Sequence, residues 1–363
     1  LYVNSIVMQK PSLKKNTGGG KSFTHKLIRK TKSIFTGLKK SDAGFWVYSP
    51  FTLPVHHISW ARSLNELLLR KQMENIIRKL EIHDPIIWVA CPAACDVAIN
   101  ILDSCFRRND KMRRAKLIYL KTDVYEEFPN VDIGLIGERD LRLKANADLT
   151  IFVSRALYDE ESGQCKKAIY LDHGVDFHLF ASAEQDPYKP GDIAEIPRPI
   201  VGFFGEIADY TVDIGFIEKV IDYLPGKSFV FVGEVSVDCS GLVAKDNVWM
   251  LGKKPYEEIP HYGKCFDVAI MPWRQNRWIE LCNPIKLKEY LALGKPVVST
   301  PFSELRGFRD VVYEARNPED FAEGIRKALA EDSPTRVVDR RKKVETSTWD
   351  SKAELVLNKL FEK

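Results

Sequence analysis

The sequence lacks any long apolar run. None of its segments holds the roughly 18 consecutive apolar residues that a helix needs to cross a bilayer, and none has the basic start and short apolar core of a secretory signal peptide. Acidic residues are absent from residues 1–41, which contain ten Lys or Arg, so basic charge is concentrated at that end. We therefore expect a cytoplasmic protein, and because the chain starts at Leu1 we expect further residues upstream.

Clear metal and phosphate-loop motifs are also missing. Cys91 and Cys95 are the only close pair among the seven cysteines, and a C-x3-C spacing without a second pair or a histidine is a poor metal signal. Gly20-Lys21-Ser22 resembles the end of a P-loop, but no glycine precedes it at the required spacing. We expect no metal site, and we expect the cysteines to be buried thiols in a reducing compartment.

The composition is that of an ordinary globular protein. Of the 363 residues, 45% are hydrophobic and 29% are charged, which excludes wholesale disorder, and the length suffices for two α/β domains with separate cores. Short apolar runs alternate with amphipathic helical patterns along the chain, and this alternation predicts parallel, doubly wound sheets. The predicted strands are 45–49, 86–90, 116–120, 149–153, 199–204, 229–233, 248–251, 266–271 and 297–300.

The stretch 280–301 carries the most informative pattern. Asn283-Pro284 supplies a cap and a first-turn proline for a helix. Gly294 ends that helix, because glycine accepts a left-handed backbone, and a β-branched strand buried on both faces follows. The apolar residues that recur with helical spacing in between are Leu287, Tyr290, Leu291 and Leu293.

Lys286 and Glu289 lie three residues apart on the predicted solvent side of this helix, near its N-terminus. Free N–H groups at a helix N-terminus attract anions, so the pair suits a phosphorylated ligand. An ordinary surface ion pair explains the same spacing. The spacing alone leaves both interpretations open.

The basic segment 21–40 also has two interpretations. Its apolar residues are interleaved with seven Lys or Arg, which suits an anionic membrane surface that holds a helix by charge and by apolar insertion. A solvated helix packed on its own domain has the same pattern. No nucleic-acid recognition motif accompanies the charge, so we expect no nucleic-acid partner.

Several candidate residues follow predicted strands, and ligands of doubly wound sheets bind beyond the carboxyl ends of strands. Asp123, Ser154 and His173 are such residues in the first half, with an ordinary turn histidine as the alternative for His173. In the second half, the strand 199–204 runs into Gly205, where the lack of a side chain lets a ligand approach. Arg274 follows the strand 266–271, and a surface loop position explains it equally well.

Two segments resemble a known family. The run NPIKLKEYLALGKPVVST (283–300) resembles the nucleotide-sugar motif of family 4 GT-B glycosyltransferases, in the branch of teichuronic-acid and other cell-surface polysaccharide glycosyltransferases, and YLDHGVDFHLF (170–180) is similar to a second family segment. The resemblance implies an α/β protein with two Rossmann-like, doubly wound domains and an interdomain cleft. The implied parts are an acceptor-side domain over 1–180, a linker over 181–199, a nucleotide-sugar domain over 200–345 and a terminal helix over 346–363 that crosses back to the first domain.

The resemblance also implies roles for individual residues. Glu289 matches the glutamate that holds the ribose of the nucleotide, and Lys286 supplies positive charge to the diphosphate. The family's earlier glutamate corresponds to Leu281, so either Glu280 takes its role or this branch does without it. The implied donor-binding residues are Gly205, Glu206, Arg274, Asn283, Lys286 and Glu289, the catalytic ones are Asp123, Glu280 and Lys286, and the acceptor-side ones are Gly19, Gly20, Ser154 and His173.

From this resemblance we expect a retaining, metal-independent hexosyltransferase that needs no cofactor. It moves a sugar from a nucleotide-sugar donor, UDP-linked, to a lipid-linked or polysaccharide acceptor in cell-surface glycan synthesis. Segment 21–40 would bind it peripherally to the inner face of the cell membrane. Because Leu281 replaces one family glutamate, a non-catalytic GT-B scaffold subunit is the alternative, and a sugar-nucleotide epimerase is a third hypothesis.

Overall fold

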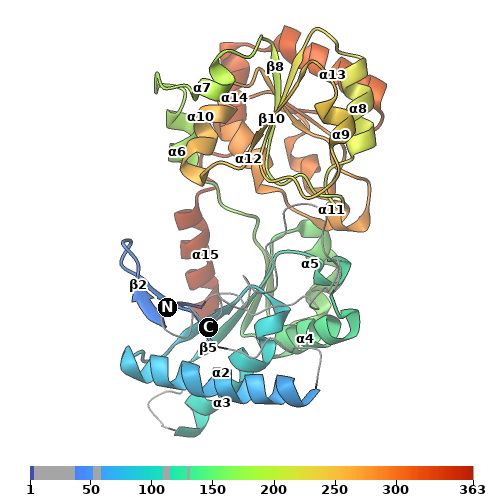
Figure 1. The fold of residues 1–363 in the computed structure, drawn as a ribbon. Coiled ribbons are helices and arrows are strands. Elements are labelled where there is room, and N and C mark those ends of the chain that lie inside the picture. Colours follow the sequence, from blue (N-terminus) through green and yellow to red (C-terminus); the bar gives the residue numbers. More distant parts are fainter. Residues whose placement is uncertain (4–36, 52–58, 109–114, 129–130, 363) are drawn as a thin grey trace. The chain divides into compact units, whose positions relative to one another are not determined.

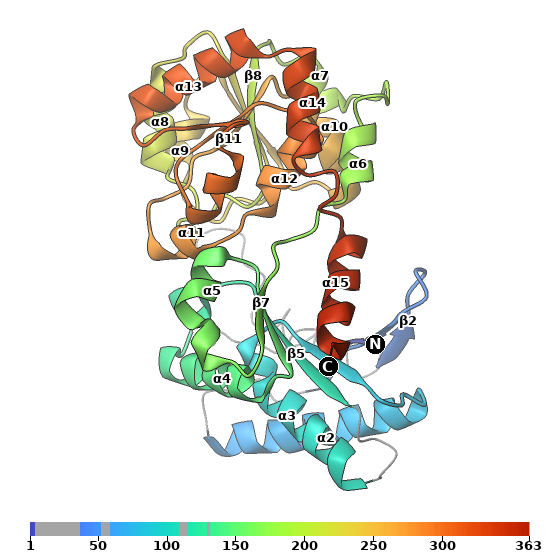
Figure 2. The same ribbon diagram turned by 180° about the vertical axis from the view of Figure 1, so that it is seen from behind.

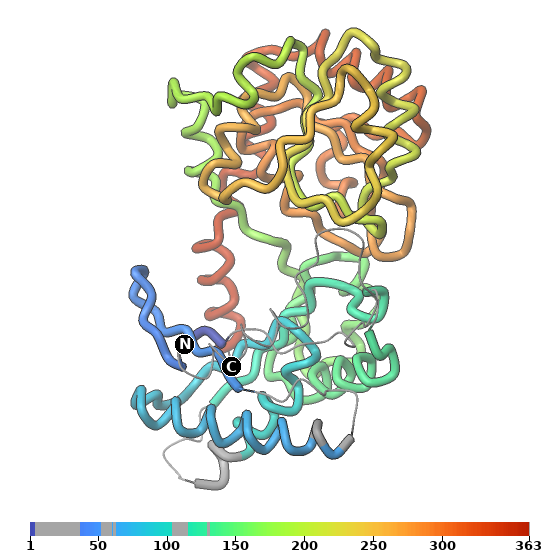
Figure 3. Tube along the Cα trace, in the orientation of Figure 1, coloured from blue at the N-terminus to red at the C-terminus, as the bar shows by residue number. Residues whose placement is uncertain are grey.

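The computed structural model describes residues 1–3, 37–51, 59–108, 115–128 and 131–362 (Figure 3). The chain forms two compact units. The first unit contains Leu1–Phe152 and Glu160–Ile169, and the second contains Val153–Asp159 and Tyr170–Lys363. The domain boundaries expected from the sequence stay predictions.

The first unit contains two sheets. The larger one has the strand order β4-β5-β6-β7, and β5 pairs in parallel with both β4 and β6. Its strands are β4 (Ile86–Val89), β5 (Lys116–Lys121), β6 (Leu149–Phe152) and β7 (Ala168–Tyr170). The smaller sheet has the order β1-β3-β2, from β1 (Tyr2–Val3), β2 (Leu38–Lys40) and β3 (Trp46–Tyr48).

The helices of the first unit are α2 (Ser59–Lys79), α3 (Cys95–Arg108) and α4 (Ile133–Asn146), and α5 (Arg155–Glu161) begins in the second unit and ends in the first. The predicted basic helix over 21–40 does not extend to its expected end, because Leu38–Lys40 forms strand β2. The rest of that segment lies almost wholly outside the described residues. Among the helices that the structure describes, none combines the length and apolarity that a bilayer crossing requires.

A buried ion-pair network joins β5 to α4. Lys121, at the end of β5, is fully buried, and its ammonium lies 2.9 Å from Oδ1 of Asp140. The hydroxyl of Tyr119 donates to the same carboxylate oxygen, and Lys144 pairs with Asp140 and Glu161. Buried charges are tolerated when each has a partner of opposite sign. The network therefore fixes the carboxyl end of β5, which Asp123 follows.

The second unit has one six-stranded sheet, in which all neighbouring strands pair in parallel. In spatial order its strands are β10 (Val248–Gly252), β9 (Ser228–Val232), β8 (Ile200–Phe204), β11 (Val268–Met271), β12 (Val297–Ser299) and β13 (Val312–Glu314). All residues of the four central strands are buried, as expected for a sheet covered on both faces.

Helices cover both faces of this sheet. Figures 1 and 2 show α8, α9 and α13 on one face and α10, α12 and α14 on the other. The helices of the second unit are α6 (Phe177–Ser182), α7 (Gly191–Ala194), α8 (Ile214–Asp222), α9 (Ser240–Val243), α10 (Ile259–Gly263), α11 (Arg277–Leu281), α12 (Ile285–Ala292), α13 (Pro318–Glu331), α14 (Pro334–Lys342) and α15 (Trp349–Phe361). The α/β class with doubly wound parallel sheets that the sequence predicts is confirmed.

One glycine of β8 is required by packing. A β-carbon at Gly202 would lie 2.2 Å from the ring of Phe266, which is fully buried. We predict that Gly202→Ala lowers the free energy of unfolding of the second unit by about 2 kcal/mol, because the core must shift to admit the methyl group. Urea denaturation followed by tryptophan fluorescence measures this. Gly226→Ala, with no atom within 4 Å of its β-carbon, is the control, and equal midpoints for the two variants would contradict the packing argument.

Candidate donor-binding site

The candidate site is built around α12. Its end is as predicted, since Gly294 follows it with φ +78°. The predicted cap is wrong: Pro284 is the N-cap residue, and no side chain caps the helix. The amide of Asn283 instead donates a 2.7 Å hydrogen bond to the carbonyl of Val153. The N-terminal N–H groups of α12 are therefore left without a side-chain partner, which favours an anion there.

The side chain of Lys286 closely approaches the backbone of Gly205. It follows β8 with φ +137°, a conformation that residues with a side chain rarely adopt. A β-carbon at this position would lie 1.8 Å from Cε of Lys286. Gly233, after β9, allows an equally close approach, because a β-carbon there would lie 1.9 Å from the carbonyl oxygen of Gly205. Gly205 therefore makes room for the lysine, and Gly233 makes room for the backbone of Gly205.

Lys286 has no carboxylate within ion-pair distance among the described residues. Its ammonium lies 5.9 Å from the ring centroid of Trp273, which is nearly fully buried. Burial lowers the pKa of Lys286, and the negative charges of Glu289 and Glu206 oppose that effect. Because no carboxylate in the described part of the chain pairs with it at close range, the ammonium of Lys286 is available to an anionic ligand.

Glu289 is only 4% exposed. The prediction that it lies with Lys286 on the solvent side of α12 is therefore wrong. The hydroxyl of Tyr256 donates a 3.2 Å hydrogen bond to its Oε1. Burial raises the pKa of Glu289 to about 6, against the opposing effects of Lys286 and of the Tyr256 hydroxyl. A buried carboxylate with few partners is a strong acceptor for the hydroxyl groups of a ligand.

The other expected donor-binding and catalytic residues of the second unit have different surroundings. Glu206 is exposed and accepts a 3.2 Å hydrogen bond from Ser236. Arg274 pairs with Asp209 at 2.8 Å, so part of its charge is already balanced. Glu280 is exposed on α11. Their predicted roles stay predictions.

The remaining expected residues belong to the catalytic and acceptor-side groups. Asp123 follows β5 in the first unit, and burial raises its pKa against the opposing effects of Thr122 and Lys121. Ser154 is fully buried, and its Oγ accepts a 3.4 Å hydrogen bond from the backbone N–H of Leu157. That contact makes Ser154 a helix cap. Gly19 and Gly20 lie outside the described residues.

His173 lies beside a buried cluster around Lys288. Lys288 is 2% exposed, and its ammonium donates to the carboxylate of Asp172, the carbonyl of His173 and the hydroxyl of Ser347. Lys352 binds the other oxygen of Asp172. Burial alone would raise the pKa of Asp172, but the two ammonium groups lower it. Burial, reinforced by Lys288, lowers the pKa of His173 to about 4, so this histidine is neutral at physiological pH.

Comparison with known proteins agrees with this architecture. Residues 198–331, which include the whole of α12, match the family described as glycosyl transferases group 1. The sucrose-phosphate synthase of Thermosynechococcus elongatus superposes with a TM-score of 0.68 at 16% identity, covering 89% of this chain and 84% of that one. Both are consistent with two Rossmann-like domains. The chain has the GT-B fold.

Two further comparisons add to the GT-B assignment. TuaH of Bacillus subtilis (strain 168), whose name describes a teichuronic acid biosynthesis glycosyltransferase, is 29% identical over 230 residues. The match covers 60% of this chain and spans 57% of the length of TuaH. The structure of Alr3699/HepE of Anabaena in complex with UDP and glucose has a TM-score of 0.63 at 15% identity, with 87% and 86% of the two chains covered.

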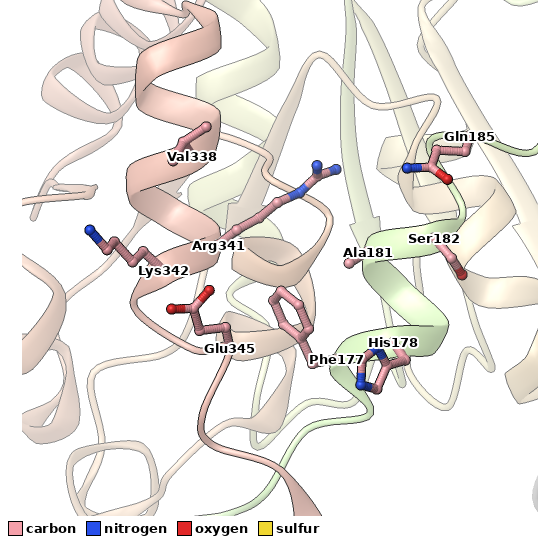
Figure 4. Close-up of a pocket in the computed structure, with 9 residues that line it drawn as sticks. All are labelled: Phe177, His178, Ala181, Ser182, Gln185, Val338, Arg341, Lys342 and Glu345. Atoms are coloured by element: carbon pink, nitrogen blue, oxygen red, sulfur yellow. The ribbon is translucent and has the colours of Figure 1, made fainter.

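The GT-B chain also has a groove at the opposite end of α12. Figure 4 shows it between α6 and α14. Its volume is about 470 Å³. Arg341 lines this groove and donates to the carbonyls of Ala292 and Leu293, where α12 ends. None of the residues expected to bind donor or acceptor lines it. The groove is therefore separate from the candidate donor site.

Sequence reasoning missed two polar residues of the second unit. Lys288 lies within the motif, but its partner Asp172 is 116 positions away, so spacing gives no sign of the pair. Tyr256 lies in the segment 255–261, and nothing in that segment indicates a contact with Glu289 33 residues later. The one available signal was Lys288 itself, a polar residue inside an otherwise apolar helical pattern.

The Lys288 cluster gives a stability prediction. Lys288→Met leaves α12 without its bond to Asp172, so we expect the free energy of unfolding of the second unit to fall by about 3 kcal/mol. Lys352→Met is the control, because it removes the more exposed of the two lysines and leaves Lys288 on Asp172, and it is expected to cost about 1 kcal/mol. Chemical denaturation measures both, and a larger loss for Lys352→Met would refute the central position of Lys288.

Proposed function

We propose that this protein is a retaining glycosyltransferase that moves a sugar from a UDP-linked donor to a lipid-linked or polysaccharide acceptor in cell-surface glycan synthesis. The observation that carries the proposal is the meeting of Gly205, Lys286 and Glu289 at the N-terminal end of α12. The match to glycosyl transferases group 1 covers this region. The name of TuaH and the UDP bound to HepE support the glycan pathway and the nucleotide.

The proposed chemistry follows from the charges of the site. As the bond from the sugar to the diphosphate breaks, negative charge grows on the leaving diphosphate. Fixed positive charge and oriented N–H groups stabilise such a leaving group. Lys286 and the uncapped N-terminus of α12 supply both, and the absence of a side chain at Gly205 lets the lysine reach this position. Glu289 accepts hydrogen bonds from the ribose hydroxyls and so orients the donor. No metal ion is needed for these steps.

Substitutions at α12 test donor binding. Glu289→Ala and Lys286→Met are each expected to weaken UDP binding by about 10- to 100-fold, because hydrogen bonds to a charged group contribute about 1.5–3 kcal/mol. Isothermal titration with UDP measures the dissociation constants. Glu323→Ala, which removes an exposed carboxylate of α13 paired with Arg326, is the matched control and should leave binding unchanged. Equal affinities for all four proteins would exclude this helix as the donor site.

The pKa of Glu289 gives a pH prediction. The raised value of about 6 means that the carboxylate is ionised above that pH and protonated below it. Ribose hydroxyls donate to the ionised form, so donor affinity is expected to be full near neutral pH and to fall as pH drops through about 6. UDP-glucose is the suitable ligand, because the terminal phosphate of UDP itself titrates near pH 6. Glu289→Gln should show no such dependence, and an unchanged profile in that variant would assign the titration to another group.

A non-catalytic scaffold is the second candidate. It is favoured by the exposure of Glu280, which lies next to the position where the family has its first glutamate, and by the acidic Glu206 after Gly205. A scaffold binds no nucleotide, whereas the proposed enzyme binds UDP and releases it from a donor when the acceptor is supplied. Measuring UDP release from UDP-glucose and other UDP-sugars separates the two functions.

A further inference from the structure

The carboxylate of Glu289 accepts a hydrogen bond from the hydroxyl of Tyr256, a residue that is 46% exposed. Tyr256 lies in the short helix η5 (Tyr256–Glu258), which follows β10. The hydroxyl donates to Oε1 of Glu289 at 3.2 Å. A carboxylate has two oxygens and about four acceptor positions, so this bond leaves Oε2 free for a ligand.

An aromatic frame holds the ring of Tyr256 in place. Its edge meets Phe180 of α6, with centroids 5.9 Å apart and planes at 64°. Phe180 is fully buried and contacts Phe204, the last residue of β8, at 6.3 Å. Phe204 packs on Tyr290 of α12 at 4.3 Å and donates its backbone N–H to the hydroxyl of Tyr290. The frame thus links the strand before Gly205, helix α12 and Tyr256 within one unit.

We propose that Tyr256 is a positioning residue for the donor site: its hydroxyl fixes the rotamer of Glu289, so that Oε2 faces the two ribose hydroxyls of a nucleoside diphosphate sugar. The proposal rests on the function proposed above and adds a residue to it. Tyr256 acts through Glu289 and takes no part in the transfer of the sugar.

The charges around the pair agree with this role. Lys286 and the Tyr256 hydroxyl both lower the pKa of Glu289, against the effect of burial. Burial raises the pKa of Tyr256, and the nearby carboxylates of Glu289, Asp176 and Glu257 raise it further. The phenol therefore keeps its proton throughout the range in which Glu289 titrates. It is a permanent donor, and the carboxylate is its acceptor.

The test is Tyr256→Phe, which removes the hydroxyl and keeps the ring against Phe180. We expect the pH midpoint of UDP-glucose binding to move upward by about half to one pH unit, because a donor to the ionised form is lost. Affinity near pH 8 should fall less than affinity near pH 6, because only the loss of the fixed Glu289 rotamer acts at the higher pH. Tyr223→Phe is the matched control, since it deletes a hydroxyl that bonds to Glu319 on the surface of the same unit.

A second readout separates this inference from the proposed function. Carbon-13 NMR of labelled glutamate, with Glu289→Gln for assignment, reports the pKa of Glu289 without any nucleotide. An upward shift of the Glu289 pKa in Tyr256→Phe that is absent from Tyr223→Phe supports the positioning role, whether or not UDP-glucose binds. A failure of UDP-glucose to bind would overturn only the proposed function. An unchanged pKa of Glu289, or an affinity equal to that of the wild type at every pH, would overturn the role of Tyr256.

Discussion

The close approach of the Lys286 side chain to the backbone of Gly205 is the contact on which the candidate donor site depends. A β-carbon at Gly205 would overlap Cε of the lysine, so only glycine permits this arrangement. The glycine ends β8 in the centre of a six-stranded parallel sheet, and the lysine stands in the first turn of α12. Sheet and helix therefore place an ammonium group at the carboxyl end of a central strand, where doubly wound folds bind ligands.

The polar residues of α12 point to different partners. Lys286 lies over Gly205, Lys288 binds Asp172 and Ser347, and Glu289 accepts from Tyr256. All three are wholly or largely removed from solvent, which is costly for ionised groups unless each has a partner. Lys288 has three partners, whereas Lys286 has no carboxylate within ion-pair distance among the described residues. Lys288 therefore holds α12 in place, whereas Lys286 is available to the diphosphate of the proposed donor.

Local features of the fold could be predicted from the sequence, and long-range ones could not. Gly294 ends α12 because its backbone is left-handed, a property of the residue itself. The buried strands were recognisable from their β-branched runs. By contrast, the solvent-side placement of Glu289 failed, because its burial depends on elements far away in the chain. Asn283 failed as a cap for the same reason, since the carbonyl of Val153, 130 positions away, takes its amide.

The central claim is that helix α12 binds the donor through Lys286 and Glu289. A crystal structure of the chain with UDP tests it most directly. The account predicts the diphosphate beside Gly205, within hydrogen-bond distance of the Lys286 ammonium, and the ribose hydroxyls on the carboxylate of Glu289. UDP bound elsewhere, with Glu289 still bonded only to Tyr256, would contradict it.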